Sequence, residues 1–153
     1  MADYWATHIE DWTFTHCGEL LSGHREYYER IASLQPKDLD RAGTECRVFL
    51  PLRNRPAESQ VSQCCLVGPS FLDLVRYGLR TPDDPHVRKT LPVMDAVLRV
   101  ETSCGPTWHG NSDGYGEHED GSPYDGTGVG RAWPLLTGER GHYTSWRRAG
   151  QTR

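Results

Sequence analysis

Apolar residues recur at helical spacing near the start of the chain. Trp5, Ile9 and Trp12 follow one another at intervals of four and three residues, with acidic residues between them. This spacing lines one face of an α-helix and predicts a helix over residues 2–15. A shorter pattern of the same kind, in "HREYYERIAS", predicts a second helix over residues 24–33.

The middle of the chain begins without a regular pattern. From residue 35 to residue 63 prolines interrupt the sequence, and "RVFLPL" is the one strand-like stretch. Long irregular segments are unusual inside compact domains and are often functional. Regular spacing returns in "SFLDLVRYGL", where Ser70 is suited to cap a helix and Gly78 to end it in a left-handed conformation.

The clearest helical pattern follows "TPDDP". Thr81 as the cap and Pro82 at the first helical position predict where this helix begins. Proline inside a helix removes a hydrogen bond and costs ~3 kcal/mol, so Pro92 predicts a kink or a boundary near Leu91. The apolar residues at helical intervals are Val87, Leu91, Met94 and Leu98.

A glycine-rich segment separates this helix from a last one. Residues 105–130 contain eight glycines, and the last helix is predicted to start near Arg131. The whole pattern predicts an all-α fold with four or five helices, long loops and almost no strands.

Composition and charge exclude several classes of protein. The chain has 153 residues, a net charge of −4 and no basic stripe, which argues against a nucleic-acid partner. No polybasic tract or apolar run of the ~20 residues that a membrane span needs is present, so no membrane partner is expected. The start, "MADYWATHIEDW", lacks the features of a signal peptide. The five cysteines are odd in number and form no C-x-x-C, which favours free thiols.

Motifs for cofactors and metals fail on inspection. "GTGVG" lacks the third glycine of a dinucleotide-binding turn and the lysine of a phosphate-binding loop. A calcium loop that starts at Asn111 would need glutamate at its twelfth position, where Ser122 stands. His118-Glu119 is not followed by the second histidine of a zinc hydrolase. We expect no cofactor and no metal, with an irregular calcium site in the acidic loop as an open alternative.

Carboxylates and aromatic rings gather in the same part of the chain. Each carboxylate alone is typical of a solvated loop, but together around a cleft with tryptophan and tyrosine they would suit sugar hydroxyls. The carboxylates between residues 101 and 139 include Glu101, Asp113, Glu117, Glu119, Asp120, Asp125 and Glu139.

Two long stretches carry a resemblance to a known family. "FLDLVRYGLRTPDDPHV" and "MDAVLRVETSCGPTWHGNSDGYGEHEDGSPYDGTGVGRAWPLLTGERGHY" resemble glycoside hydrolase family fifteen, in particular its bacterial glucoamylases and glucodextranases. "ADYWATHIEDWTFTHCG" is similar to the family segment that follows the general-acid region. The resemblance implies a partial glucoamylase-like domain over residues 1–143 and a non-matching basic tail over residues 144–153. Residues 35–69 match poorly.

The resemblance implies an incomplete segment of an (α/α)6 barrel. Family members release glucose from the non-reducing ends of α-glucans with inversion, which needs a general acid and a general base. In the family these lie in a Trp-Glu-Glu type segment and a Trp-(Ser/Ala)-His-Ala-Glu type segment, and neither occurs in this sequence. We therefore expect no catalytic residue in this chain and no activity from it alone. The implied partners are an α-glucan or oligosaccharide substrate of the parent enzyme and the missing halves of the barrel.

The resemblance also implies which residues line the substrate cleft. Trp133 matches the tryptophan that stacks on sugar near the first subsites. Trp108 and Tyr115 fall in the glycine-rich segment that forms its rim. Glu117 is implied to accept hydrogen bonds from sugar hydroxyls, and Arg131 to open the helix behind them.

Two further expectations follow from the same comparison. Gly138, Glu139, Arg140 and Gly141 are expected to form a structural turn in which the glutamate and the arginine pair. Family members have the sequence Trp-His-Arg-Tyr-Asn at the position where this chain has "TWHGNS". The resemblance therefore implies that this chain lacks an arginine that contacts sugar in the deepest subsite. Its loss would cost on the order of 1.5–3 kcal/mol of binding.

Alternatives remain open at this point. The runner-up is a non-catalytic α-helical protein that binds carbohydrate or has a structural role. The resemblance does not separate starch from dextran or other α-glucosides. It also leaves the native compartment open, including a secreted or periplasmic parent enzyme.

Overall fold

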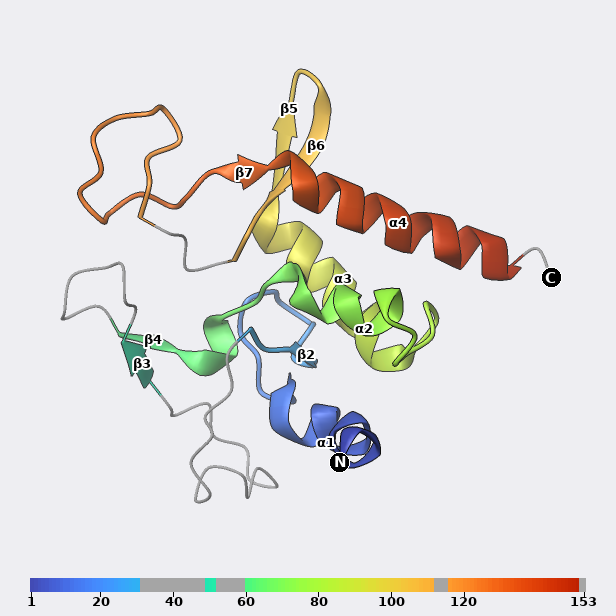
Figure 1. The fold of residues 1–153 in the computed structure, drawn as a ribbon. Helices are drawn as coiled ribbons and strands as arrows, with labels where there is room; N and C mark the ends of the chain where they lie inside the picture. Colours follow the sequence, from blue (N-terminus) through green and yellow to red (C-terminus); the bar gives the residue numbers. More distant parts are fainter. Residues whose placement is uncertain (31–48, 52–59, 112–115, 152–153) are drawn as a thin grey trace.

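The computed structural model of the protein describes residues 1–30, 49–51, 60–111 and 116–151 (Figure 1). Three small antiparallel sheets accompany the helices in this part of the chain. The helices are α1 (Ala2–Thr13), α2 (Leu72–Arg76), α3 (Pro85–Leu98) and α4 (Pro134–Gln151), with 3-10 turns η2 (Gln63–Cys65) and η3 (Pro69–Phe71). The strands are β1 (Phe14–Thr15), β2 (Tyr27–Tyr28), β3 (Phe49–Pro51), β4 (Gln60–Ser62), β5 (Arg99–Thr102), β6 (Gly105–His109) and β7 (Ala132–Trp133).

Helix α3 forms the middle of the hydrophobic core. Its four predicted apolar residues are all buried, so the periodic pattern is confirmed. The helix runs unbroken through Pro92, whose side chain is exposed, and the predicted boundary near Leu91 is wrong. The core residues from the other elements are Phe14, Tyr28, Val67, Phe71, Leu72, Val75, Trp108, Leu136 and Tyr143.

The start of α3 differs from the prediction. Asp84, not Thr81, is the N-cap, and its carboxylate accepts hydrogen bonds from the backbone N–H groups of His86 at 2.8 Å and Val87 at 3.3 Å. Pro85 then occupies the first helical position, where its missing N–H costs nothing. Asp84 is the N-cap instead of Thr81 because its carboxylate reaches two N–H groups of the first turn that have no partner within the helix.

The C-terminal end of helix α2 agrees with the prediction, and its N-terminal end does not. Gly78 has φ of +74°, and the N–H of Gly78 donates to the carbonyl of Val75, so the left-handed stop is confirmed. Ser70 is not the cap, because it lies inside the 3-10 turn that precedes the helix and its side chain makes no capping bond.

The N-terminal region contains one predicted helix rather than two. The first helix is confirmed as α1, but Trp5 is 56% exposed and no α1 residue is fully buried. The helix predicted over 24–33 is wrong where the structure describes it. Tyr27 and Tyr28 instead pair with β1, and Tyr27 packs so deeply that burial raises its pKa to about 12.

The strands correct the all-α prediction. β3 confirms the strand-like stretch, and β5, β6 and β7 form an antiparallel sheet in that order. In Figure 1, α3 leads directly into the β5–β6 hairpin, and α4 starts beside β7 and extends away to the C-terminus. The fold is therefore mixed, with helices dominant in the described residues.

The C-terminal helix starts close to its predicted position, and one cysteine requires a correction. Helix α4 begins at Pro134, near the predicted start at Arg131, and continues past Tyr143 to Gln151; the division of the chain after Tyr143 stays a prediction. Cys17 is disulfide-bonded, which contradicts the expectation that all the cysteines are free thiols. Cys64, Cys65 and Cys104 are not disulfide-bonded.

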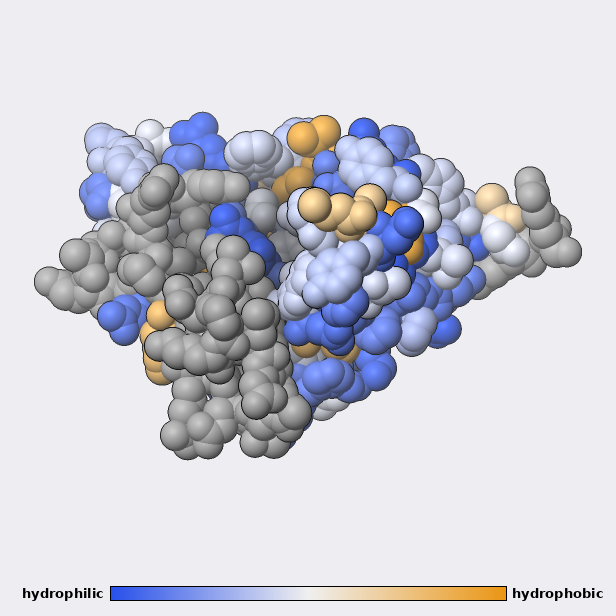
Figure 2. Space-filling view, turned by 60° about the horizontal axis from the view of Figure 1, so that its bottom comes forward, coloured by the Kyte–Doolittle hydropathy of each residue, from blue (hydrophilic) through white to orange (hydrophobic). Residues whose placement is uncertain are grey.

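The face in Figure 2 shows mainly hydrophilic and weakly polar side chains in its described part, with apolar spots that are small and separate. No described helix is both long enough and apolar enough to cross a membrane.

Candidate functional site

Two tryptophans face each other across β6 and β7 but have different surroundings. Trp108 pairs in register with Trp133. Trp108 is only 6% exposed, and its indole N–H donates to Asp95 at 3.0 Å, so it packs within the core. Trp133 is 44% exposed. Of the two residues, Trp133 is the one that solvent reaches.

The rim loop, residues 116–131, leads into Trp133. Gly116 forms a bridge with Gly128, and the N–H of Gly130 donates to the carbonyl of Glu117 at 2.9 Å. A Cβ on Gly128 would lie 2.0 Å from that carbonyl oxygen, which no side chain tolerates. In the structure, this glycine therefore lets the loop backbone cross itself closely.

Two carboxylates of the rim loop stabilise its turns. Asp125 accepts hydrogen bonds from the hydroxyl and N–H of Thr127 and from His118. These bonds, led by the Thr127 hydroxyl, lower the pKa of Asp125 to about 2. Asp120 is bonded in the same way to Ser122, and its pKa is also lowered. Both groups are ionised at neutral pH, which makes them unsuitable as general acids.

Glu117 and Arg131 lie at opposite ends of the rim loop. Glu117 is partly buried, and its Oε2 is a buried atom without a hydrogen-bond partner in the described structure. Arg131 is exposed, and its Nε lies 3.4 Å from the carbonyl of His118. Arg131 precedes α4 by three residues, so it does not open that helix as predicted. Tyr115 lies outside the described residues.

A row of polar side chains on β6 was missed by the sequence reasoning. Thr107 and His109 alternate with Trp108 on β6, so they lie on the opposite face of the strand, and Asn111 follows two residues after the strand ends at His109. Asn111 is 2% exposed. Thr107 Oγ1, His109 Nδ1 and both amide atoms of Asn111 are buried and find no partner among the described residues. The alternation in "TWHGN" would have revealed this row had a strand been predicted there.

The predicted turn at residues 138–141 does not exist, because these residues lie inside α4. Glu139 and Arg140 also do not pair with each other. Arg140 donates to Asp95 at 2.8 and 3.2 Å, and this aspartate also holds Trp108. Residues one apart on a helix point in different directions, which explains the separation.

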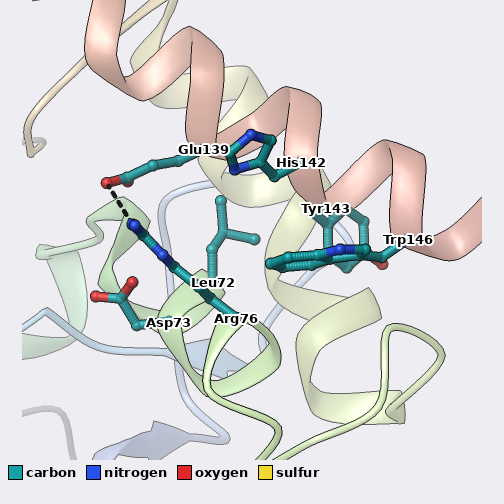
Figure 3. Close-up of a pocket in the computed structure, with 7 residues that line it drawn as sticks. All are labelled: Leu72, Asp73, Arg76, Glu139, His142, Tyr143 and Trp146. Carbon is teal, nitrogen blue, oxygen red and sulfur yellow. Dashed lines mark ion pairs between the residues drawn. The ribbon is translucent and has the colours of Figure 1, made fainter.

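Glu139 instead faces a hollow between α2 and α4 (Figure 3). Its carboxylate lies 3.9 Å from Arg76, and burial, followed by the charge of Asp73, raises its pKa. The figure shows His142 and Trp146 along the same wall. The hollow has a volume of about 10 Å³, room for roughly one water molecule and none for a sugar ring.

Among the described residues, no group of three or more histidine, cysteine, aspartate or glutamate side chains is placed to hold a metal ion. The candidate groups that remain are the exposed Trp133 and, on the opposite face of the β6–β7 pair, the polar side chains of β6 with the adjoining rim loop. An exposed indole, a carboxylate, an amide and an imidazole each suit a neutral ligand rich in hydroxyl groups.

Comparisons with known proteins identify the relatives of the chain. No protein-family model matches it. It is similar to the glucoamylase of Clostridium sp. (strain G0005), with 43% identity over 143 residues, 93% of this chain and 19% of that enzyme. A crystal structure of bacterial glucoamylase complexed with acarbose matches it with 41% identity and a TM-score of 0.77, over 93% of this chain and 20% of the other. The chain thus spans about one fifth of the relatives it matches. The predicted resemblance to the bacterial glucoamylases of glycoside hydrolase family fifteen is confirmed.

Proposed function

Because this chain resembles one fifth of a bacterial glucoamylase, we propose that it forms part of the substrate-binding wall of a glucoamylase-like glycoside hydrolase. The parent activity is the release of glucose from the non-reducing ends of α-glucans with inversion. The observation that carries this proposal is the match, in sequence and in fold, to a glucoamylase that was solved with acarbose bound.

The position of Trp133 supports a role in binding sugar. Trp133 is 44% exposed and lies between the rim loop and α4, directly before the helix. An exposed indole presents a flat apolar face on which a pyranose ring can stack. Burial makes Trp108 a positioning residue instead, because its hydrogen bond to Asp95 ties β6 to α3.

We place both catalytic carboxylates outside this chain. Inversion needs an acid and a base about 6.5–9.5 Å apart on opposite sides of the scissile bond. The sequence contains neither family segment that supplies them. Asp120 and Asp125 are held as ionised turn-forming groups, and Glu139 faces a hollow too small for sugar. The same proposal makes the described helices part of an (α/α)6 barrel whose other helices come from outside these residues.

Binding of acarbose tests the proposal. The protein should bind acarbose in isothermal titration calorimetry, and Trp133→Ala should weaken that binding by ~1–3 kcal/mol, as expected for a lost stacked ring. Trp5→Ala is the matched control, because Trp5 is also an exposed tryptophan but lies on α1. It should bind acarbose as the wild type does.

The outcomes separate the alternatives. A wild-type protein that does not bind acarbose would contradict the proposed function. Equal affinities for wild type and Trp133→Ala, together with a lower melting temperature for the variant, would give Trp133 a packing role only.

A further inference from the structure

We infer that Asn111 is a ligand-positioning residue that binds a pair of hydroxyl groups of a neutral polyhydroxy ligand where the end of β6 meets the rim loop. The inference rests on the proposed function and adds to it a residue that the sequence reasoning did not identify. It starts from the buried atoms of the polar row on β6.

The Asn111 amide is an exception to a general rule. Buried polar groups in native proteins nearly always have hydrogen-bond partners, since leaving one unpaired costs about 1–3 kcal/mol. Asn111 is 2% exposed, yet its Nδ2 and Oδ1 both lack a partner among the described residues. Rotating the amide by 180° changes nothing, because both of its ends are unpaired.

Further unpaired atoms belong to neighbouring positions. His109 Nδ1 and Thr107 Oγ1 belong to β6, which ends two residues before Asn111. Glu117 Oε2 is also unpaired, and the Glu117 backbone is bonded to Gly130, two residues before β7. Since β7 pairs with β6, Glu117 lies near the end of the row. Several unpaired atoms in one region indicate a binding site rather than an isolated packing defect.

The chemistry of these atoms selects the ligand class. The amide of Asn111 offers two donors and one acceptor, and Glu117 offers an acceptor. His109 Nε2 lies 3.1 Å from the carboxylate of Glu119, so in the neutral ring this nitrogen carries the proton and Nδ1 is an acceptor. A hydroxyl group both donates and accepts, so it can satisfy either kind of atom.

A charged ligand would satisfy the unpaired atoms of Asn111, His109 and Glu117 less well than a neutral one. An anion would be repelled by the carboxylates of Glu117 and Glu119. A cation would leave the two amide donors of Asn111 unsatisfied. Adjacent hydroxyl groups on an uncharged ring satisfy donors and acceptors together, which is the arrangement that a glucan offers.

The test uses a substitution that separates binding from stability. Asn111→Leu keeps a similar volume but removes the unpaired amide, so the free protein should melt at the wild-type temperature or above it. Its affinity for acarbose, measured by isothermal titration calorimetry, should fall at least about tenfold. Asn111→Asp, which keeps the shape but removes both donors, should lose affinity to a similar extent. Ser103→Ala, at the exposed tip of the β5–β6 hairpin, is the control and should change neither property.

Each outcome decides the question. Wild-type affinity in Asn111→Leu or Asn111→Asp overturns the inference and leaves the proposed function intact. A melting temperature several degrees below wild type for Asn111→Leu shows that the amide has partners in the free protein, and it also overturns the inference. If the wild type itself does not bind acarbose, the proposed function fails and the inference fails with it.

Discussion

At the scale of single residues, Glu10 connects distant parts of the chain. Its carboxylate accepts hydrogen bonds from Arg80 at 2.6 and 2.8 Å and from the hydroxyl of Tyr28 at 2.5 Å. Burial raises the pKa of Glu10, but the hydrogen bonds from Arg80 and Tyr28 outweigh it, and the pKa lies below the ordinary value of 4.5. A carboxylate with a lowered pKa stabilises the folded state above its unfolded pKa, and this contribution is lost as the pH falls through the folded value.

We predict that Glu10→Gln lowers the free energy of unfolding by about 1–3 kcal/mol at pH 7, since Arg80 loses its charged partner. Chemical denaturation followed by circular dichroism measures this change. The difference from wild type should shrink as the pH falls below 4.5, the ordinary value, and through the lower pKa of the folded state. Glu26→Gln removes an exposed pair with Lys89 and should cost less than about 1 kcal/mol. Equal losses in the two variants would contradict the role given to Glu10.

At the scale of secondary-structure elements, α3 is the element on which the others pack. It carries six of the buried residues, contacts β2 and continues directly into the β5–β6 hairpin. Its N-terminus is fixed by the Asp84 cap, and Asp95 near its C-terminal end holds both Trp108 and Arg140. One helix therefore determines where β6, α4 and the exposed Trp133 lie.

We predict that Asp84→Ala destabilises the protein by about 0.5–2 kcal/mol, the usual cost of losing an N-cap. Thr81→Ala should leave stability within about 0.5 kcal/mol of wild type, because Thr81 is exposed and does not cap the helix. Thermal and chemical denaturation of the two variants under one set of conditions compares them. If Thr81→Ala lowered the free energy of unfolding more than Asp84→Ala, Thr81 would be the N-cap, as the sequence predicted.

Some elements could be predicted from the sequence, and others could not, for physical reasons. The stripe of α3 and the stop at Gly78 depend on local spacing and local backbone freedom, so they were found. β2 was missed because its two tyrosines are placed by partners elsewhere in the chain, and burial overrides their helical spacing. The exposure of Trp133 depends on the β6–β7 pairing, and the buried polar groups of β6 become visible in the alternation of "TWHGN" only once a strand is predicted there.

At the scale of the whole molecule, most of the carboxylates discussed above stabilise the fold. Glu10 and Asp95 neutralise arginines, Asp84 caps a helix, and Asp125 closes a turn. Glu139 has the raised pKa that a general acid needs, but its hollow admits no sugar. These structural roles agree with the proposal that the catalytic carboxylates lie outside this chain.

We predict that the purified chain releases no glucose from maltose or isomaltose above the buffer rate. Acid–base catalysis contributes roughly 10²–10⁴ in rate for each group, and both groups are proposed to lie outside this chain. A coupled glucose assay measures release by wild type, Glu117→Gln, Glu119→Gln and Glu139→Gln. Turnover by the wild type that one of these changes abolishes would place a catalytic carboxylate inside the chain.

The crossing of Gly116 and Gly128 has a consequence for how the rim loop can vary. The backbone closes on itself at this point, and Glu117, His118 and Glu119 make further contacts beside the bridge, so the residues between Glu119 and Gly128 form a module that is held at its base. A longer insertion in this module costs little, because each doubling of loop length adds only about 0.6 kcal/mol. Evolution or protein engineering can therefore exchange the tip of this loop, and with it the reach of the rim, while the junction glycines and the strand that carries Trp133 stay unchanged.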